Sequence, residues 1–466
     1  MKAIIATTVL GVFMMFAGIA VNNKKSIVAL AILLFAALFG VTIYELMDTP
    51  ANSSQLLFNN MLQIDHSSLW FNMLMTGCTL LYVALMGKEI MKVGLHVAEY
   101  FALIFFILCG LYILTTYNNL LMLFIGIEIL SIPQYILAGS DKRNLKSSEA
   151  SLKYFLMGAF STGILLMGIT LLYGASSTFY IDKFGSILHF DNINPLAIAG
   201  IVFIMIALSF KVSAAPMHMW TPDVYDGSPT AFTAFMATVV KAGAFFAFLR
   251  LFHISFNSLG QHWVLLLAII TAATLFVGNV TAVFQQSVKR MLAYSSIAQA
   301  GFMLFAILSV NSADAAYGMR GIIFYGVAYS VATIGIFSVL IKLKDYTYDG
   351  FNGLAKSEPF LAFVSSIFLF SLAGIPLTGG FMAKFYVLTA VVHQGQLMWL
   401  VIFALLMAAI SVYYYFRVII AMYFKPGTPE LNSPITTGDR ILLAITCALV
   451  LLLGIYPQLF LESVAK

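Results

Sequence analysis

The sequence predicts an all-α, polytopic membrane protein with about fourteen transmembrane helices. Hydrophobic residues make up 61% of its 466 positions and charged residues only 9%, whereas about a quarter of a typical soluble domain is charged. The apolar runs are about 20 residues long, which is the length of a membrane-crossing helix, and they lack the strict alternation of a transmembrane barrel. These observations exclude a soluble domain and favour a helical bundle.

The apolar runs place the expected spans along the chain. Their approximate positions are 3–21, 26–46, 68–87, 97–116, 119–138, 152–175, 195–222, 229–253, 262–284, 289–309, 316–342, 359–393, 397–424 and 439–461. The first run has a single lysine before it and a second span directly after it. We therefore interpret it as a membrane helix and not as a cleaved signal peptide.

Two of these runs are not simple membrane helices. A straight helix over 359–393 would be about 50 Å long, far beyond a hydrocarbon core of roughly 30 Å, and GIPLTGG from Gly374 to Gly380 provides a break. The run 195–222 contains Pro216. Paired interruptions of this kind are typical of inverted-repeat transporters, which carry polar sites at the breaks. We expect spans seven and twelve to be broken helices.

Because the breaks fall five spans apart, the sequence predicts two inverted five-helix repeats. We expect three N-terminal membrane helices in 1–96, a first five-helix repeat in 97–255, a second in 256–426 and a C-terminal membrane helix in 427–466. Five is an odd number of crossings, so consecutive repeats enter the membrane with opposite orientation. The positive-inside rule assigns most of the 24 lysines and arginines to inner loops if both termini lie on the outer side.

Three lysines remain inside apolar runs under this topology, namely Lys211, Lys241 and Lys384. A lysine at mid-bilayer costs between about 3 and 15 kcal/mol, so such residues are rare and usually face an interior path. Glu128, in LLMLFIGIEILSIPQYIL, is the acidic residue most clearly central to a span. These four residues are expected to form a charge-handling site.

Glu128 and Lys211 are expected to pair across facing helices, because pairing offsets part of the cost of burying each charge. Two interpretations of the pair remain open. It either locks two helices together, or it acts as an electrostatic switch in which separation allows the lysine to release a proton.

Lys241 has no acidic residue within its own span, which favours a proton relay over a side chain that extends to the interface. Lys384 follows the second break and either belongs to a proton path or caps carbonyls freed by the broken helix. His218 is a candidate for proton uptake near neutral pH, but an interfacial histidine has the same sequence context. Trp220 and Tyr225 beside it match the aromatic residues of a membrane interface.

Several kinds of chemistry have no signal in the sequence. There is no GxxxxGK[ST], GxGxxG or CxxCH motif, so we expect this chain to bind neither nucleotide nor redox centre. The three cysteines, Cys78, Cys109 and Cys447, lie in separate apolar runs and argue against a metal site. The net charge of +5 follows from membrane topology and is no indication of nucleic-acid binding.

Long motifs resemble those of a known family. The stretch FIGIEILSIPQYILAGSDKRNLKSSEASLKYFLMGAFSTGILLMGITLLYGASSTF resembles the fifth and sixth helices of subunit N of bacterial NADH-quinone oxidoreductase, which is respiratory complex I. The motifs FKVSAAPMHMWTPDVYDGSPT and KRMLAYSSIAQAGFM are similar to signatures that this family shares with Mrp-type cation/proton antiporters. A lysine at position 384 and an end at Lys466, directly after the last span, favour the subunit N branch.

The resemblance implies a fourteen-helix antiporter-like subunit in the membrane arm, which pumps protons while quinone is reduced elsewhere. It assigns Glu128 and Lys211 to an ion pair, Lys241 to the central relay and Lys384 to the second broken helix. It implies no cofactor in this chain, with FMN, iron–sulfur clusters and quinone in partner subunits. The partners are then the other membrane-arm subunits and membrane lipids, the transported ion is the proton, and the location is the bacterial inner membrane.

Two functions remain open at this point, a proton-pumping subunit of a redox complex and a subunit of an Mrp-type cation/proton antiporter. A purely structural scaffold explains the sequence less well, because it would bury four ionisable groups without need. Flavin and iron–sulfur absorbance that co-purifies with the chain would distinguish the first function from the second.

Overall fold

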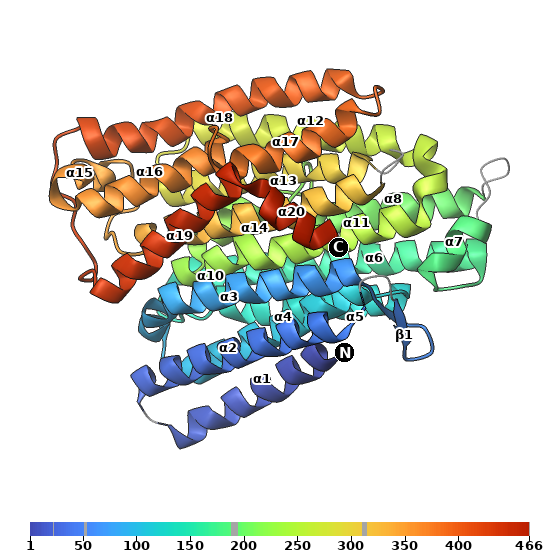
Figure 1. The fold of residues 1–466 in the computed structure, drawn as a ribbon, viewed down its shortest axis with the longest axis horizontal. Helices are drawn as coiled ribbons and strands as arrows, with labels where there is room; N and C mark the ends of the chain where they lie inside the picture. Colours follow the sequence, from blue (N-terminus) through green and yellow to red (C-terminus); the bar gives the residue numbers. More distant parts are fainter. Residues whose placement is uncertain (22, 51–53, 188–193, 310–314, 466) are drawn as a thin grey trace.

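The computed structural model describes residues 1–21, 23–50, 54–187, 194–309 and 315–465. Most of them lie in helices that run side by side in one bundle (Figure 1). Within the described ranges, twelve helices are long and apolar enough to cross a membrane, and three shorter apolar helices accompany them. The fold is therefore that of an all-helical, polytopic membrane protein.

The first part of the chain forms three long helices and a small hairpin. Its elements are α1 (Lys2–Ala20), α2 (Lys24–Asp48), β1 (Gln55–Leu57), β2 (Leu62–Ile64) and α3 (His66–Val93). The two strands pair antiparallel, with Leu56 opposite Gln63. The purely helical prediction missed this hairpin because strands of three residues are too short to show an alternating pattern. We call this end of the bundle the hairpin end.

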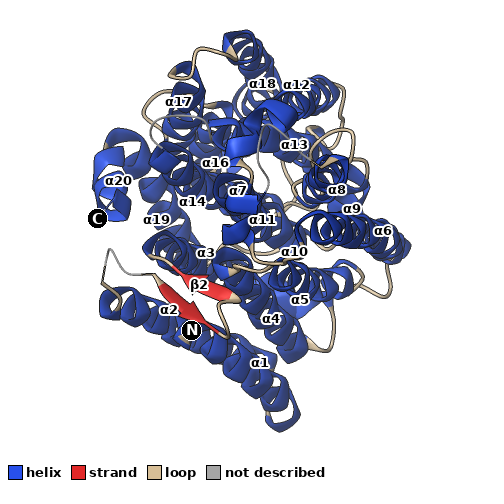
Figure 2. Ribbon diagram, turned by 90° about the vertical axis from the view of Figure 1, so that its right-hand side faces the viewer, coloured by secondary structure: helices blue, strands red, loops and turns tan. Residues whose placement is uncertain are grey.

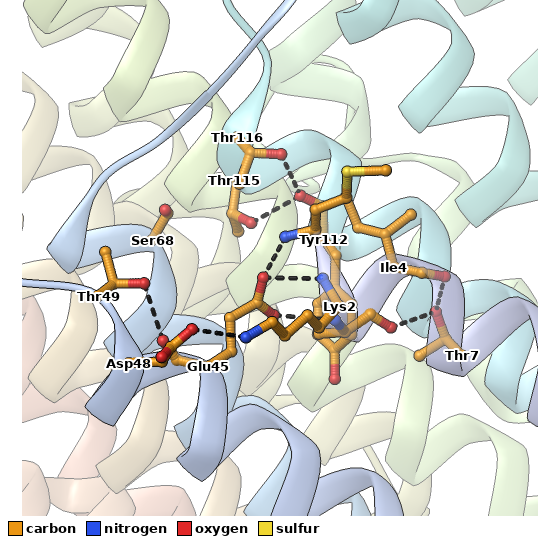
Figure 3. A network of polar contacts seen from close by, with 12 residues as sticks. Lys2, Ile4, Thr7, Glu45, Asp48, Thr49, Ser68, Tyr112, Thr115 and Thr116 are labelled. Carbon is orange, nitrogen blue, oxygen red and sulfur yellow. Dashed lines mark hydrogen bonds and ion pairs between the residues drawn. The ribbon is translucent and has the colours of Figure 1, made fainter. Parts of the chain in front are cut away.

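Glu45 on α2 holds the beginning of α1 (Figure 3). Its carboxylate accepts hydrogen bonds of 2.9 Å from the backbone N–H groups of both Lys2 and Ala3. An α-helix leaves such groups unpaired in its first turn. The Lys2 amine also forms an ion pair with Asp48, close to the end of α2. These contacts fix the two N-terminal helices to each other at the hairpin end.

The central part of the chain contains the first interrupted helix. Its elements are α4 (Val97–Thr116), α5 (Leu120–Ala138), α6 (Leu145–Ser176), α7 (Ile181–Ile187), α8 (Pro195–Lys211), α9 (Trp220–Gly227), α10 (Thr230–Phe235), a π-helical turn (Met236–Val240) and α11 (Lys241–Ser255). Asparagine side chains cap α5, α6 and α8 at their N-termini, which satisfies backbone donors there. The expected seventh span is thus divided between Lys211 and Trp220.

The last part contains the second interruption. Its elements are a 3₁₀ turn (Asn257–Leu259), α12 (Gly260–Val283), α13 (Val288–Leu308), α14 (Ala315–Leu340), a 3₁₀ turn (Asp349–Phe351), α15 (Leu354–Ser357), α16 (Pro359–Ala373), α17 (Gly379–Val392), α18 (Met398–Phe424), α19 (Thr437–Ile455) and α20 (Pro457–Ala465). The expected single span at 439–461 is two helices, because Pro457 restricts the residue before it and starts a new helix.

The centre of the bundle is formed by α11, α13 and α14, which other helices surround on all sides in the view along the bundle (Figure 2). The outer helices present large apolar side chains outward, such as Phe13 on α1, Phe160 on α6 and Leu405 on α18. This distribution is expected for a protein whose outer surface contacts lipid.

A buried ion cluster fixes the opposite end of the bundle, which we call the α15 end. Lys342, just after α14, donates to Glu89 on α3 at 3.0 Å and to Asp439 on α19 at 3.4 Å. All three side chains are buried. Breaking such a cluster by removing one partner leaves an uncompensated buried charge, so it ties α3, α14 and α19 firmly together.

Candidate functional site: buried lysines at helix interruptions

The interruption after α8 positions Lys211. The last helical residue is Lys211 itself, and helix resumes at Trp220. The indole N–H of Trp220 donates to the carbonyl of Phe210 at 3.0 Å, which satisfies an acceptor that the break leaves without a helical partner. The Lys211 amine donates to the Ser131 hydroxyl on α5 at 2.8 Å and lies 3.4 Å from the Tyr135 hydroxyl.

Glu128 lies one turn before Ser131 on the same helix. Its carboxylate accepts a hydrogen bond of 2.8 Å from the Thr162 hydroxyl on α6. Among the ion pairs between described residues, none joins Glu128 to Lys211. Glu128 is nevertheless only one helical turn from Ser131, which accepts the hydrogen bond of Lys211. The structure therefore holds the two charges near each other but apart, with Ser131 beside them.

Lys241 follows the π-helical turn and faces α13. Its side chain is only 2% exposed. The amine donates to the Ser296 carbonyl at 3.1 Å and also to the Ser296 hydroxyl, and it lies 5.8 Å from the centre of the Tyr225 ring. Within the described ranges no carboxylate forms an ion pair with Lys241. π-helical turns occur frequently at functional sites.

Lys384 lies on α17 and reaches back to the end of α16. Its amine donates to the carbonyls of Leu372 and Ala373 at 3.1 and 2.8 Å and lies 4.7 Å from the centre of the Phe302 ring. These carbonyls are in the last turn of α16, where helical partners are lacking. The geometry is the capping arrangement that we considered from the sequence, and it leaves Lys384 without a carboxylate partner in the described part of the chain.

Polar side chains of α13 connect the surroundings of Lys241 and Lys384. Ser296, which holds Lys241, is preceded by Ser295, whose hydroxyl bonds to that of Tyr415. Gln299, one turn further along α13, lies 3.4 Å from the Tyr415 hydroxyl and donates to the Leu372 carbonyl at 2.8 Å. That carbonyl also accepts from Lys384. Because Ser295 and Ser296 are consecutive residues, the hydrogen-bonded groups around the two lysines adjoin each other along α13.

Aromatic side chains lie between the surroundings of Lys211 and Lys241. The rings of Tyr135 and Tyr154 meet edge to face at 4.7 Å, Tyr154 stacks on Trp220 at 4.5 Å, and Trp220 meets Tyr225 at 5.9 Å. Trp220 and Tyr225 are 3% and 1% exposed. They are interior residues, so their interpretation as interfacial aromatics does not hold.

His218 lies in the loop between α8 and α9 and is partly exposed. In the described part of the chain, none of its hydrogen bonds reaches Glu128 or the three lysines. No group of three His, Cys, Asp or Glu side chains is arranged to hold a metal ion among the residues described. The residues that sequence reasoning missed are the partners, Ser131 and Ser296 above all, because hydroxyl residues are common in membrane helices and carry no distinctive pattern.

Two interrupted helices, each with a lysine beside the break, define an antiporter-like membrane subunit. Residues 117–411 match the family described as NADH:quinone oxidoreductase/Mrp antiporter, transmembrane region. Subunit N of NADH-quinone oxidoreductase from Cytophaga hutchinsonii is 41% identical over 99% of both chains. The chain belongs to the family of NADH-quinone oxidoreductase subunit N, the antiporter-like membrane subunit of complex I.

Other relatives and solved structures agree with this assignment. Subunit N from Flavobacterium psychrophilum is 36% identical over 99% of this chain and 100% of its own. A chain of respiratory complex I from Thermus thermophilus with bound aureothin superposes with a TM-score of 0.83 at 29% identity, covering 99% and 98% of the two chains. A chain of the Mrp complex from Dietzia sp. DQ12-45-1b shares the fold, with a TM-score of 0.84 at 18% identity over 100% and 96%.

The predicted family is thereby confirmed. The chain is a multi-pass membrane subunit of NADH-quinone oxidoreductase, which is a translocase complex, and membership of that complex implies other subunits as partners.

Proposed function

We propose that this chain carries protons across the membrane through Glu128, Lys211, Lys241 and Lys384 while quinone is reduced elsewhere in complex I. The observation that carries the proposal is the chemistry of the lysine partners. The three amines donate to hydroxyl and carbonyl oxygens and form no ion pair with a carboxylate within the described ranges. A lysine held this way can lose its proton without leaving a buried carboxylate unpaired.

Lys342 shows the opposite arrangement. It is as buried as Lys241 and Lys384, but Glu89 and Asp439 both bind it, so these two carboxylates require Lys342 to keep its charge. The contrast between a lysine fixed by carboxylates and lysines held by neutral oxygens supports a structural role for the first and a transfer role for the others.

In this proposal Glu128 and Lys211 form the switch. Approach of the carboxylate to the amine favours the charged lysine, and retreat to Thr162, as in this structure, favours proton release toward the interior path. Lys241 then relays the proton along α13, and Lys384 receives it. His218, partly exposed at the first break, is the proposed uptake group, and water completes the steps that the side chains do not span.

The same proposal includes the membrane architecture. Together with the twelve long helices, the segment 195–222, which begins with α8, and α16 with α17 would complete fourteen spans, arranged as two inverted five-helix repeats over 97–255 and 256–426. Helices in 1–96 and 427–466 flank them, and both termini lie on the outer side of the bacterial inner membrane. We expect FMN, iron–sulfur clusters and quinone in partner subunits.

The test of the transfer role uses two variants of Lys241 in the whole complex. Arginine keeps the charge but effectively never releases its proton. We expect Lys241→Arg and Lys241→Ala each to lower proton pumping by about 100-fold or more, the usual contribution of a positioned proton-transfer group. The measurement is the quenching of a pH-sensitive dye in membrane vesicles, normalised to assembled complex.

The matched control is Lys342→Arg, at the buried lysine with carboxylate partners. It retains the charge that its two partners need, so pumping should persist wherever the complex assembles. A Lys241→Arg variant that pumps at the parental rate would show that Lys241 is only a fixed charge.

Orientation is tested separately with single-cysteine variants at exposed sites. Leu145, at the start of α6, and Ser186, on α7, are both exposed. We expect a membrane-impermeant thiol reagent to reach Leu145→Cys only from the inner side and Ser186→Cys only from the outer side. The reverse labelling would overturn the orientation and leave the transfer role untouched.

A further inference from the structure

An apolar groove, separate from the lysine site, runs along the surface of the bundle between α3 and α19. It has a volume of about 640 Å³. Val327 and Val331 of α14 form its floor, and Leu459 and Phe460 of α20 border it at the hairpin end. Phe460 is fixed by an edge-to-face contact with Phe324 on α14. None of the described residues that line the groove is charged.

The length of the groove follows from the helices that form its walls. On α19 the lining extends from Leu442 to Leu453 and on α3 from Trp70 to Ala84, which correspond to about 16 and 21 Å at the rise of an α-helix. Half of a bilayer's hydrocarbon core is about 15 Å thick. The groove therefore extends through roughly one leaflet.

The two ends of the groove differ. At the α15 end it is closed, because Lys88, one turn beyond Ala84, forms an ion pair of 3.2 Å with Asp439, one turn before Leu442. This bond joins α3 to α19, and the buried pair of Asp439 with Lys342 lies behind it. At the hairpin end α20 borders the opening without closing it.

The cross-section of the groove limits what can occupy it. A volume of 640 Å³ over a length of about 16 to 21 Å corresponds to a mean cross-section of about 30 to 40 Å². A helix with its side chains is about 10–12 Å in diameter, which requires at least twice that area. A single extended chain fits inside the groove, whereas a helix of a neighbouring subunit could insert only its side chains.

The chemistry of the opening indicates which extended chain is bound. Trp70 and Tyr456 stand at the hairpin end, the Trp70 indole bonded to His66 at 2.9 Å and Tyr456 61% exposed. Rings of this kind lie at the level of lipid headgroups. We propose that the groove binds one acyl chain of a membrane phospholipid, with the headgroup beside Trp70 and Tyr456 and the chain end toward the Lys88–Asp439 ion pair.

The first experiment uses the unmodified complex in vesicles that contain a phosphatidylethanolamine with a diazirine on one acyl chain. After illumination, lipid adducts are mapped by mass spectrometry of peptides. We expect adducts to concentrate severalfold on the lining of α3 and α19 relative to the exposed helix α18. Adducts spread evenly over all lipid-facing helices would overturn the proposal.

The second experiment blocks the groove with a larger side chain at its edge. Leu449 lines the groove and is 37% exposed, and Leu405 lies on the open face of α18 at 56% exposed. Leu449→Trp should lower the α3 adducts severalfold, and Leu405→Trp should leave them unchanged; equal yields in both variants would contradict the proposal. A benzoylphenylalanine placed at Leu74 should give a lipid adduct, and an adduct with another subunit's peptide would instead show that protein covers the groove.

Discussion

The two helix interruptions hold their lysines in different ways. After α8, Lys211 is the last helical residue and donates to side-chain hydroxyls on another helix, α5. Between α16 and α17, Lys384 lies beyond the break and donates to two backbone carbonyls of the preceding half-helix. Lys211 is partly exposed, whereas Lys384 is only 7% exposed.

This difference indicates which lysine is free to move and which one stabilises the broken helix. A hydroxyl can rotate away from an amine at little cost, so Ser131 can release Lys211 without a change of backbone. The acceptors of Lys384 are main-chain atoms, and losing them exposes the end of a helix inside the membrane. We infer that the first lysine is the one that moves during transfer, and that the second also holds two half-helices together.

The largest expected effect comes from removing each lysine in turn. Lys211→Ala and Lys384→Ala should both abolish pumping. Only Lys384→Ala should also lower the thermal stability of the complex, because a buried acceptor left without a partner costs about 1–3 kcal/mol. Gln299 still serves Leu372, so the loss should come mainly from Ala373. Equal melting temperatures for the two variants would contradict the supporting role of Lys384.

A change at the second break should have the next largest effect. Gly374 has a positive φ of 85°, and an added methyl group would lie 3.1 Å from the Lys384 amine. Gly374→Ala should therefore strain the backbone by about 1–2 kcal/mol and displace the amine, which lowers pumping. Gly395→Ala is the matched control, because Gly395 has a φ of 72° but open space around it. Comparable pumping in both variants would show that the Lys384 position is not critical.

A substitution at the first break, Ser131→Ala, should lower pumping less. Ser131→Ala removes the closest acceptor of Lys211, a charge-assisted hydrogen bond worth about 1.5–3 kcal/mol, while the Tyr135 hydroxyl remains nearby. We expect slower pumping in vesicles at unchanged assembly. Ser131→Thr keeps a hydroxyl and should restore most of the rate. If alanine and threonine behave alike, Ser131 is not the partner that controls Lys211.

The smallest expected effect is on the pH dependence of stability. It concerns Asp223 on α9, the helix that follows the first break. Partial burial raises the pKa of Asp223, but hydrogen bonds from Lys153 and Arg290, both 2.9 Å, outweigh it and hold this pKa below its usual value. The stabilisation is therefore complete above the unfolded pKa of about 3.9 and is lost as the pH falls below it. Asp223→Asn should therefore flatten the dependence of the melting temperature on pH below about pH 4; an unchanged dependence would exclude this contribution.

Much of this architecture could be predicted from sequence because membranes impose simple rules. Long apolar runs identify helices, and proline and glycine identify the interruptions. Lys211, Lys241 and Lys384 stood out because charged residues are rare in such runs. Each of these signals is local, so a single sequence is enough to detect it.

The rest depends on contacts between distant segments. Nothing in the pattern of α5 indicated that Ser131 would meet Lys211, or that Ser296 would hold Lys241, because these pairs are set by how helices pack. From the sequence, Lys384 could either belong to a proton path or cap the carbonyls at the end of α16. The capping geometry follows only from how the two half-helices are arranged. The β1–β2 hairpin was missed because its strands are too short to produce a periodic signal. The separate α20 was missed because its apolar residues continue the run of α19 beyond Pro457.

The π-helical turn before Lys241 has a consequence for sequence length in this segment. A π turn accommodates one residue more than an α turn, so the helix faces before and after Met236–Val240 are out of step by about 100°. Deleting any one of these five residues would restore a regular helix and rotate α10 against α11. Lys241 could then keep its hydrogen bonds to Ser296 only if α10 rotated and lost its packing against neighbouring helices. An insertion or deletion in this segment rotates α10 relative to α11, whereas a substitution changes only one side chain. Insertions and deletions should therefore be tolerated far less here than substitutions.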